Sequence, residues 1–267
     1  MCIRDSTTGV YNTAMGWGAL TECVTVNNCT AVGYKALEDN TAANNTAFGS
    51  ESLKDNTSGN DNTGIGYEAL KDNTTGSDLT AVGDNALANN TTATGNTAVG
   101  SESLTANTTG ARNVAVGQYS LYGNTTAFDN TAIGYNALAS NTTGTQNVAV
   151  GSYALDANTT DSYNSAVGYQ ALSANTTGEK NTAVGSFALR DSTTSDNNTA
   201  LGSSALLSNT TGTRNTAVGG NALDAVTTGT DNTAVGYEAL TSNTASGCTA
   251  VGRQALGNNT GGVNTAV

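Results

Sequence analysis

Residues 96–112 read N-T-A-V-G-S-E-S-L-T-A-N-T-T-G-A-R, and close copies of this 17-residue repeat cover almost the whole chain. Fifteen copies begin between Asn12 and Cys248, and a sixteenth begins at Asn264. A repeat this short cannot bury its own apolar side chains, so neighbouring repeats must stack on one another. The repeat therefore predicts an elongated solenoid and not a globule with a central pocket.

We number the positions of one repeat as slots 1 to 17, so that Asn96 occupies slot 1 and Gly100 occupies slot 5. Slot 5 is Gly and slot 9 is Leu in all fifteen repeats. Three repeats are one residue shorter, and the deletions fall between slots 13 and 17, which marks an exposed loop. The repeats begin at Asn12, Cys29, Asn45, Asn62, Leu79, Asn96, Asn113, Asn130, Asn147, Asn164, Asn181, Asn198, Asn215, Asn232 and Cys248.

The length of the repeat selects strands over helices. Two-helix repeats need about 33 residues or more, and a Gly in every copy disfavours helix. We expect one strand in slots 1 to 4 and a second in slots 8 to 13, with turns at slot 5 and in slots 14 to 17. The predicted fold class is all-β: a parallel β-solenoid of about 15 coils of 16–17 residues.

Variation among the repeats predicts which slots face inward. Slot 4 holds Val, Ile, Met15, Phe48 or Leu201 and nothing polar, so we expect it to form the core with the Leu of slot 9. Slot 2 should lie on the same side as slot 4, and slot 3 on the opposite side. Slot 3 is Ala everywhere except Gly64. Close packing there is expected, against the opposite wall of a thin coil or against another chain.

Asparagine occupies slot 1 in twelve repeats and slot 12 in twelve repeats, and Cys, Leu, Val or Ser replaces it elsewhere. Apolar replacements indicate buried slots, where stacked Asn side chains can satisfy backbone groups at the corners. Glycosylation at the recurring N-x-S/T sequons is the alternative interpretation. The predicted structural ladders include Asn12, Asn45, Asn62, Asn96, Asn73, Asn107 and Asn141.

Composition argues against catalytic, cofactor-binding and metal-binding roles, and we predict no residue for any of them. The chain has no His, so the usual zinc sites and catalytic triads cannot be built. No Gly-rich segment is followed by the Lys-Ser/Thr pair of a phosphate-binding loop. The Asp and Glu residues do not recur at the spacing of calcium-binding β-rolls. A net charge of −12 argues against nucleic acid as a partner, and no long apolar run predicts contact with a membrane.

The sequence leaves two alternatives for the state of Cys23 and Cys29. Cys23 and Cys29 fill neighbouring Asn slots on either side of a loop, so they form either a short local disulfide or two buried thiols. Cys248 lies too many coils away to pair with Cys29.

Aromatic residues recur at slot 6, beside the Gly of slot 5. Such rings can stack on sugars of a host surface, or they cover the corner of the coil or a seam between chains. Besides Trp17, the candidate glycan-stacking residues are Tyr34, Tyr67, Tyr135, Tyr169 and Tyr237.

The two ends of the chain differ from those expected of a complete solenoid. Residues 1–6 match nothing in the repeat and are interpreted as a cloning or assembly scar. Residues 7–267 are one repeat array that lacks a capping element at either end, which we interpret as a fragment of a longer protein. If the open ends are native, molecules stack head to tail into extracellular filaments.

The block N-T-A-V-G-S-F-A-L at residues 181–189 and its copies resemble the A-I-G-x-x-A repeats in the head domains of trimeric autotransporter adhesins. They are equally similar to the repeat arrays of phage tail fibres and of surface proteins with chaperone domains of the endosialidase type. The period is longer here than in the adhesin heads. The resemblance implies a left-handed parallel β-roll, assembled as a homotrimer and displayed on a cell surface or a virion.

The sequence thus predicts a non-enzymatic, structural and adhesive stalk or fibre segment that is extracellular, on a cell surface or on a virion. Its partners are other copies of itself and a host-surface glycan or protein. One alternative is ice binding by a ladder of the Thr residues at slots 13 and 14. A polysaccharide-cleaving solenoid needs clustered carboxylates facing a groove, and the exposed acids show no such cluster.

Overall fold

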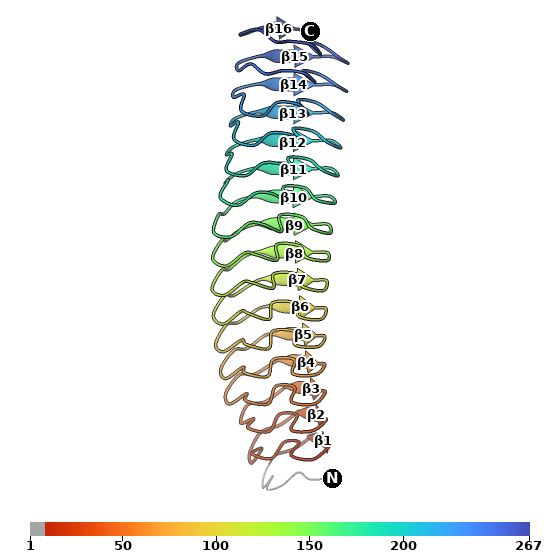
Figure 1. Ribbon diagram of the computed structural model, residues 1–267. Helices are drawn as coiled ribbons and strands as arrows, with labels where there is room; N and C mark the ends of the chain where they lie inside the picture. The colour runs from red at the N-terminus through yellow and green to blue at the C-terminus, as the bar shows by residue number, and fades with distance from the viewer. Residues whose placement is uncertain (1–8) are drawn as a thin grey trace. The chain divides into compact units, whose positions relative to one another are not determined.

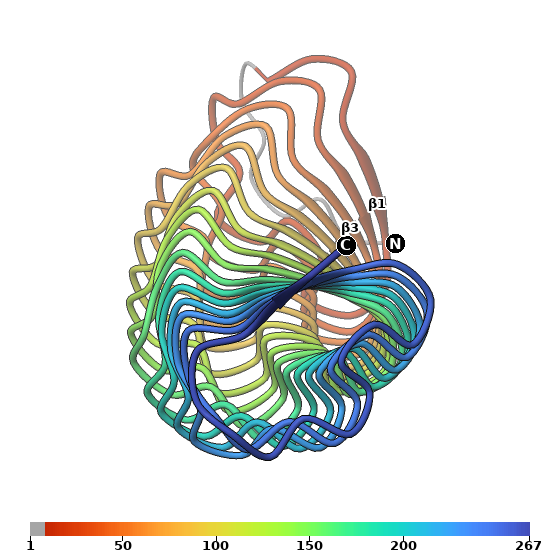
Figure 2. The ribbon, with the colours of Figure 1, turned by 90° about the horizontal axis from the view of Figure 1, so that it is seen from above.

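The computed structural model describes residues 9–267, so the predicted leader at residues 1–6 lies outside the described part. Unit 1 extends to Asn130, and unit 2 comprises residues Thr131–Val267. Within each unit, consecutive coils stack as a parallel β-solenoid (Figure 1) and follow nearly the same path when seen from above (Figure 2). The predicted all-β solenoid of about 15 coils is confirmed. Residues 9–267 contain no helix long and apolar enough to span a membrane.

Each coil contributes one short strand at slots 2 to 4, and neighbouring strands within a unit pair in parallel with identical slots opposite each other. Unit 1 contains β1 (Thr13–Met15), β2 (Thr30–Val32), β3 (Thr46–Phe48), β4 (Thr63–Ile65), β5 (Thr80–Val82), β6 (Thr97–Val99) and β7 (Val114–Val116). Unit 2 contains β8 (Thr131–Ile133), β9 (Val148–Val150), β10 (Ser165–Val167), β11 (Thr182–Val184), β12 (Thr199–Leu201), β13 (Thr216–Val218), β14 (Thr233–Val235), β15 (Thr249–Val251) and β16 (Thr265–Ala266).

The expected second strand at slots 8 to 13 is wrong, because this stretch consists of turns. Slots 7 and 9 adopt left-handed backbone in every coil, for example Glu68 with φ 53° and Leu70 with φ 56°. A positive φ at alternate residues cannot continue an extended strand. Bonding between coils nevertheless persists, since the Leu70 N–H donates to the Ala86 carbonyl at 3.0 Å. The turn stretch thus stacks almost as regularly as the strand.

Slot 5 is Gly for two reasons that act together. Its φ lies between +130° and +147° in the described coils, a region that residues with a Cβ rarely adopt. The next coil also leaves no room, because a Cβ on Gly185 would lie 2.4 Å from the carbonyl oxygen of Gly202. The two backbones therefore touch directly at this corner.

The assignment of slot 4 to the core is also wrong, since slot 3 faces inward and slots 2 and 4 face outward. Ala98 is fully buried, whereas Met15 at slot 4 is 63% exposed. The coil is thin at slot 3. Where Ser52 lies opposite, even a Cβ on Gly64 would come within 2.6 Å of Ser52 Oγ and 3.3 Å of Leu53 Cγ, and Ala occupies slot 3 in all the other repeats. The Leu side chains of slot 9 fill the interior, and only a methyl group fits opposite them. The opposite wall of the same coil explains the Ala of slot 3.

Two rows of Asn side chains close the loop at slots 12 to 17. At slot 1, the Asn62 side-chain amide donates to the Gly76 carbonyl at 2.8 Å, and its Oδ1 accepts the N–H of Leu79 at 3.0 Å. At slot 12, the Asn73 amide donates to Asn56 Oδ1 at 2.7 Å and to the same Gly76 carbonyl at 3.0 Å. Each row thus bonds to the adjacent coil, and both rows meet at the carbonyl of slot 15.

The structure places all seven predicted ladder residues in these two rows. Asn12 is half-buried and donates to the Val26 carbonyl at 2.8 Å, and the other six are fully buried. The side-chain amides that an oligosaccharide would need are buried and engaged with the backbone or with each other. These six are Asn45, Asn62, Asn73, Asn96, Asn107 and Asn141.

Val226 interrupts the slot 12 row in unit 2. The preceding coil has Asn209 at this slot, and its buried Oδ1 has no hydrogen-bond partner. The donor that normally reaches this oxygen is the amide of the next coil, which Val226 lacks. A buried acceptor without a donor costs about 1 to 3 kcal/mol.

We therefore expect Val226→Asn to stabilise the chain by about 1 kcal/mol, because the new amide would reach Asn209 Oδ1 and the Gly229 carbonyl. The reverse change, Asn73→Val, should destabilise it by at least about 2 kcal/mol, since it leaves Asn56 Oδ1 without its donor. Urea unfolding followed by circular dichroism measures both. A loss of stability in Val226→Asn would contradict the account of the row.

A second expectation concerns slot 5. Gly185→Ala should cost more than about 3 kcal/mol, because both the backbone conformation and the contact with Gly202 oppose a Cβ. Gly220→Ala is the matched control. A Cβ there would make ordinary van der Waals contacts with the Tyr237 ring at 3.5 Å and the Ser203 carbonyl oxygen at 3.9 Å, so the unfolding midpoint of this variant should change little. Equal effects of the two substitutions on the thermal unfolding midpoint would show that slot 5 is not constrained in this way.

Candidate functional site

The outer side of the strands carries a row of apolar side chains that are partly or largely exposed. We call the side chains of slots 2 and 4 in each unit the sheet face. At slot 4, Phe48 is 57% exposed and Leu201 is 46% exposed, and no polar or charged residue occurs there in any repeat. The short strands hold this row at one coil spacing, about 4.8 Å. The sheet face is therefore a regular, uncharged and partly apolar surface.

Threonines at slot 2 complete the sheet face. Twelve of the fifteen repeats have Thr there, and the others have Val114, Val148 or Ser165. Within residues 9–267, no protein group forms a hydrogen bond with the hydroxyls of these slot 2 threonines. Their hydroxyls are left for solvent or for another molecule.

The threonines of slot 13, which the ice-binding hypothesis used, are placed differently. The Thr57 hydroxyl donates to the Thr74 carbonyl at 2.9 Å, and Thr74 repeats this bond to Thr91 at 2.9 Å. The hydroxyls of this row are occupied in holding coils together. They offer a weaker ladder for binding water than the sheet face does.

The five predicted tyrosines of slot 6 lie exposed at the corner that follows each strand. In unit 1, the Trp17 and Tyr34 rings stack with centroids 5.3 Å apart, and Lys35 Nζ lies 5.8 Å from both centroids. Tyr67 lies in the same row of unit 1. Tyr135, Tyr169 and Tyr237 lie in the row of unit 2.

Sequence reasoning missed the aromatic residues of slot 7. Tyr153 and Phe187 lie next to the slot 6 row, and they join Tyr135 and Tyr169 into one series of contacting rings. Tyr119 at slot 7 contacts Tyr122 in unit 1, with centroids 5.7 Å apart. The signal was present, because aromatic residues alternate between slots 6 and 7 in consecutive repeats from Tyr135 to Phe187.

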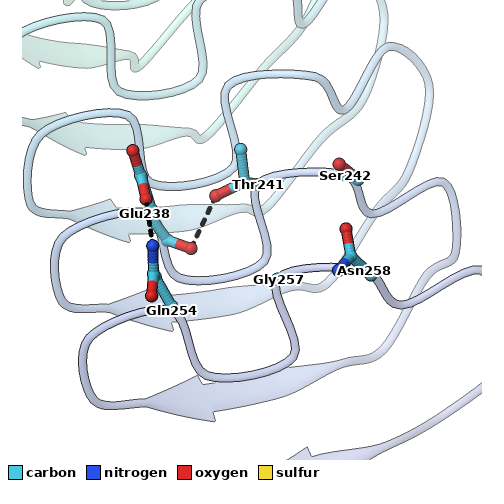
Figure 3. A pocket seen from close by; sticks show the side chains of 6 residues that line it. All are labelled: Glu238, Thr241, Ser242, Gln254, Gly257 and Asn258. Atoms are coloured by element: carbon cyan, nitrogen blue, oxygen red, sulfur yellow. Dashed lines mark hydrogen bonds between the residues drawn. The ribbon is translucent and has the colours of Figure 1, made fainter.

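A polar hollow of about 500 Å³ lies between two coils of unit 2 (Figure 3). Glu238 accepts a hydrogen bond from Gln254 Nε2 at 2.7 Å, and this bond is the main cause that lowers the pKa of Glu238. The Thr241 hydroxyl donates to the Glu238 carbonyl at 2.5 Å. One carboxylate among hydroxyl and amide groups suits hydrogen bonding to a ligand more than acid–base chemistry. Its lining residues are Glu238, Thr241, Ser242, Gln254, Gly257 and Asn258.

The three cysteines in the described part are buried thiols. Cys29 substitutes for Asn in the network, since the Asn40 side-chain amide donates to its Sγ at 3.5 Å. Burial raises the pKa of both Cys23 and Cys29, which disfavours the reactive thiolate. In residues 9–267, no three side chains of the metal-binding types come together in a group that could hold an ion.

Two carboxylates at slot 10 are turned toward the protein. Asp156 and Asp224 each have one buried oxygen without a hydrogen-bond partner. Burial raises the pKa of Asp156 to about 6, and it raises the pKa of Asp224 as well. The charged form of either side chain therefore destabilises the folded chain at neutral pH.

The expected pH dependence follows from the raised pKa of Asp156. Its folded value lies above the unfolded value of about 3.9, so the stability gained from protonation is present below pH 4 and is lost as the pH rises through 6. Asp156→Asn should therefore unfold at a higher temperature than the wild type at pH 7.5, and the difference should shrink as the pH falls toward 4. Asp84→Asn, at an exposed carboxylate, is the control. If the difference in unfolding temperature between Asp156→Asn and the wild type grew as the pH fell, the raised pKa of Asp156 would be contradicted.

The geometry thus offers two repeated surfaces for function, the sheet face and the exposed rings of slots 6 and 7. The exposed rows repeat with the coils, as is typical of solenoids that use extended surfaces for binding. A comparison of the chain with models of protein families and with curated proteins finds no match in either set.

Proposed function

We propose that the chain is a non-enzymatic structural and adhesive segment of a fibre or stalk on a cell surface or a virion. Copies of the chain associate through the sheet face. The observation that carries the proposal is the outward-facing apolar row of slot 4, whose side chains are partly or largely exposed and which holds no charged residue in any of the fifteen repeats.

Charge distribution supports the choice of the sheet face. Beyond residues 1–6, the charged residues occupy slots 6, 7, 10, 11, 16 and 17, with Asp161 as the exception. A net charge of −12 makes copies repel one another unless they meet through an uncharged surface. The sheet face is such a surface, and a solvent-facing strand position without a partner would have accepted Lys or Glu in some repeats.

Burial of the slot 4 row would also contribute energy in proportion to its length. Apolar surface contributes about 25 cal/mol per Å² when it leaves water, and every coil adds an equivalent side chain. We place three chains around the sheet faces as a homotrimer with left-handed coils, as the resemblance to adhesin heads implies. Closed rotational symmetry would cover all three faces at once.

Ice binding is the second candidate function. The candidate ice-binding surface is the sheet face and not the threonines of slot 13. The unbonded hydroxyls and the methyl groups of slot 2 recur at about 4.8 Å, next to the aliphatic row. A rigid, regular surface of this kind can order water. Association of chains and ice binding would both use the sheet face. The same purified samples can therefore be tested for both functions.

The proposal predicts that the purified chain has three times the mass of one chain in light scattering. Lys substitutions at slot 4 in unit 2, Ile133→Lys with Val167→Lys and Leu201→Lys, should give a folded monomer, because buried unpaired charges oppose association. These positions lie on the surface of one chain, so the coil itself should remain intact.

The control places the same three charges at slot 10 of unit 2, with Ala139→Lys, Ser173→Lys and Leu207→Lys. This slot already holds Lys54 and Lys71, so the control should keep the mass of the wild type. A monomeric wild type overturns the proposal, and thermal hysteresis in that monomer favours ice binding. If light scattering showed particles of indefinite mass, and the slot 4 variant did not reduce that mass, head-to-tail filaments would be favoured.

A further inference from the structure

Four rings in unit 2 form a continuous series along the corner, one from each of four consecutive coils. We call Tyr135, Tyr153, Tyr169 and Phe187 the aromatic ladder. Successive ring centroids lie 5.3, 6.4 and 5.3 Å apart, with interplanar angles of 81°, 87° and 85°. Edge-to-face contacts of this kind stabilise ring pairs beyond the burial of their surface. The rings therefore hold one another in place as a preformed surface.

The aromatic ladder remains open to solvent despite these contacts. Tyr135 is 40% exposed and Tyr169 is 46% exposed, so large parts of the slot 6 rings are available to another molecule. Phe187 ends the ladder, and the Arg190 guanidinium lies 5.8 Å from its ring centroid. That guanidinium is paired with Asp191 through two hydrogen bonds of 2.7 and 2.9 Å, so it offers little free charge.

Slots 6 and 7 carry no charged residue in the repeats that form the aromatic ladder. In six consecutive repeats, slots 6 and 7 hold only Tyr, Phe, Ser, Asn, Gln and Gly, whereas five consecutive repeats of unit 1 each carry a Lys, Asp or Glu there. Tyr with Ser, Asn and Gly is also the composition of adaptable binding surfaces in antibodies. The six pairs are Tyr135-Asn136, Ser152-Tyr153, Tyr169-Gln170, Ser186-Phe187, Ser203-Ser204 and Gly220-Asn221.

We propose that the aromatic ladder binds a neutral polysaccharide chain that lies along the stacked coils. Aromatic faces accept the C–H faces of pyranose rings, and the neighbouring hydroxyl and amide groups can exchange hydrogen bonds with sugar hydroxyls. The chemistry fits a neutral ligand, because no unpaired cation lies at the ladder to recognise a phosphate, sulfate or carboxylate.

Repetition favours a polymer over a single sugar. Equivalent ring positions recur in every second coil, Tyr135 with Tyr169 and Tyr153 with Phe187, at about 9.6 Å or twice the strand spacing, so alternate sugars of an extended chain meet equivalent positions. Several weak stacking contacts then add up along one ligand. This inference rests on the adhesive part of the proposed function, and it assigns that role to the aromatic ladder and not to the sheet face.

Calorimetric titration of the full chain with cellohexaose, mannohexaose and maltohexaose tests the inference, with a chondroitin sulfate hexasaccharide as the charged comparison. We expect one of the neutral oligosaccharides to bind and the charged one not to bind. The variant Tyr135→Ser/Tyr153→Ser/Tyr169→Ser should bind at least tenfold more weakly. Ser occurs naturally at both slots, as in Ser203 and Ser204, so the variant should fold.

The matched control is Tyr34→Ser/Tyr67→Ser/Tyr237→Ser, which removes three slot 6 rings outside the ladder and should bind within twofold of the wild type. Absence of binding to all three neutral oligosaccharides, or equal losses in the two variants, would overturn the inference. Light scattering of the same samples reports self-association separately. A trimer that binds no glycan would leave assembly through the sheet face intact.

Discussion

Every coil depends on backbone contact with its neighbours, and the narrowness of the coil makes that contact possible. At slot 5 the backbones of adjacent coils touch with no space for a Cβ, as between Gly185 and Gly202. At the opposite end of the coil, the two Asn rows bond the irregular loop from one coil to the next. Strand, turn and loop are thus kept at one common spacing, which allows the surface rows to form.

The sequence was sufficient for the class of fold, because a 17-residue period with a constant Gly and a constant Leu leaves few architectures. It was insufficient for the direction of the strand side chains. Ala fits the thin interior at slot 3, and Val is tolerated on the exposed strand face at slot 4. Because Val is more hydrophobic than Ala, composition alone assigned slot 4 to the core. The left-handed backbone of slot 9 carries no signature in the sequence, because this slot is Leu in every repeat, and that of slot 7 carries a weak one, because Gly or Asn occurs there in only four repeats.

The candidate surfaces were predictable in part. The tyrosines of slot 6 stood out because they recur, whereas Tyr153 and Phe187 did not because slot 7 is aromatic in few repeats. Recognising the ladder required the geometry of the corner, which brings slots 6 and 7 of adjacent coils into contact. The sheet face was hidden for a different reason: an exposed aliphatic row and a buried one have the same sequence.

The parallel stacking of coils within each unit also determines how the chain responds to a pulling force. Hydrogen bonds between coils point along the stacking direction, so tension in that direction pulls them apart one coil at a time and does not shear a whole sheet. Each coil that opens would release 17 residues, roughly 55 Å of extended chain, in place of about 4.8 Å of stacked length. A fibre built this way would lengthen under load before it broke.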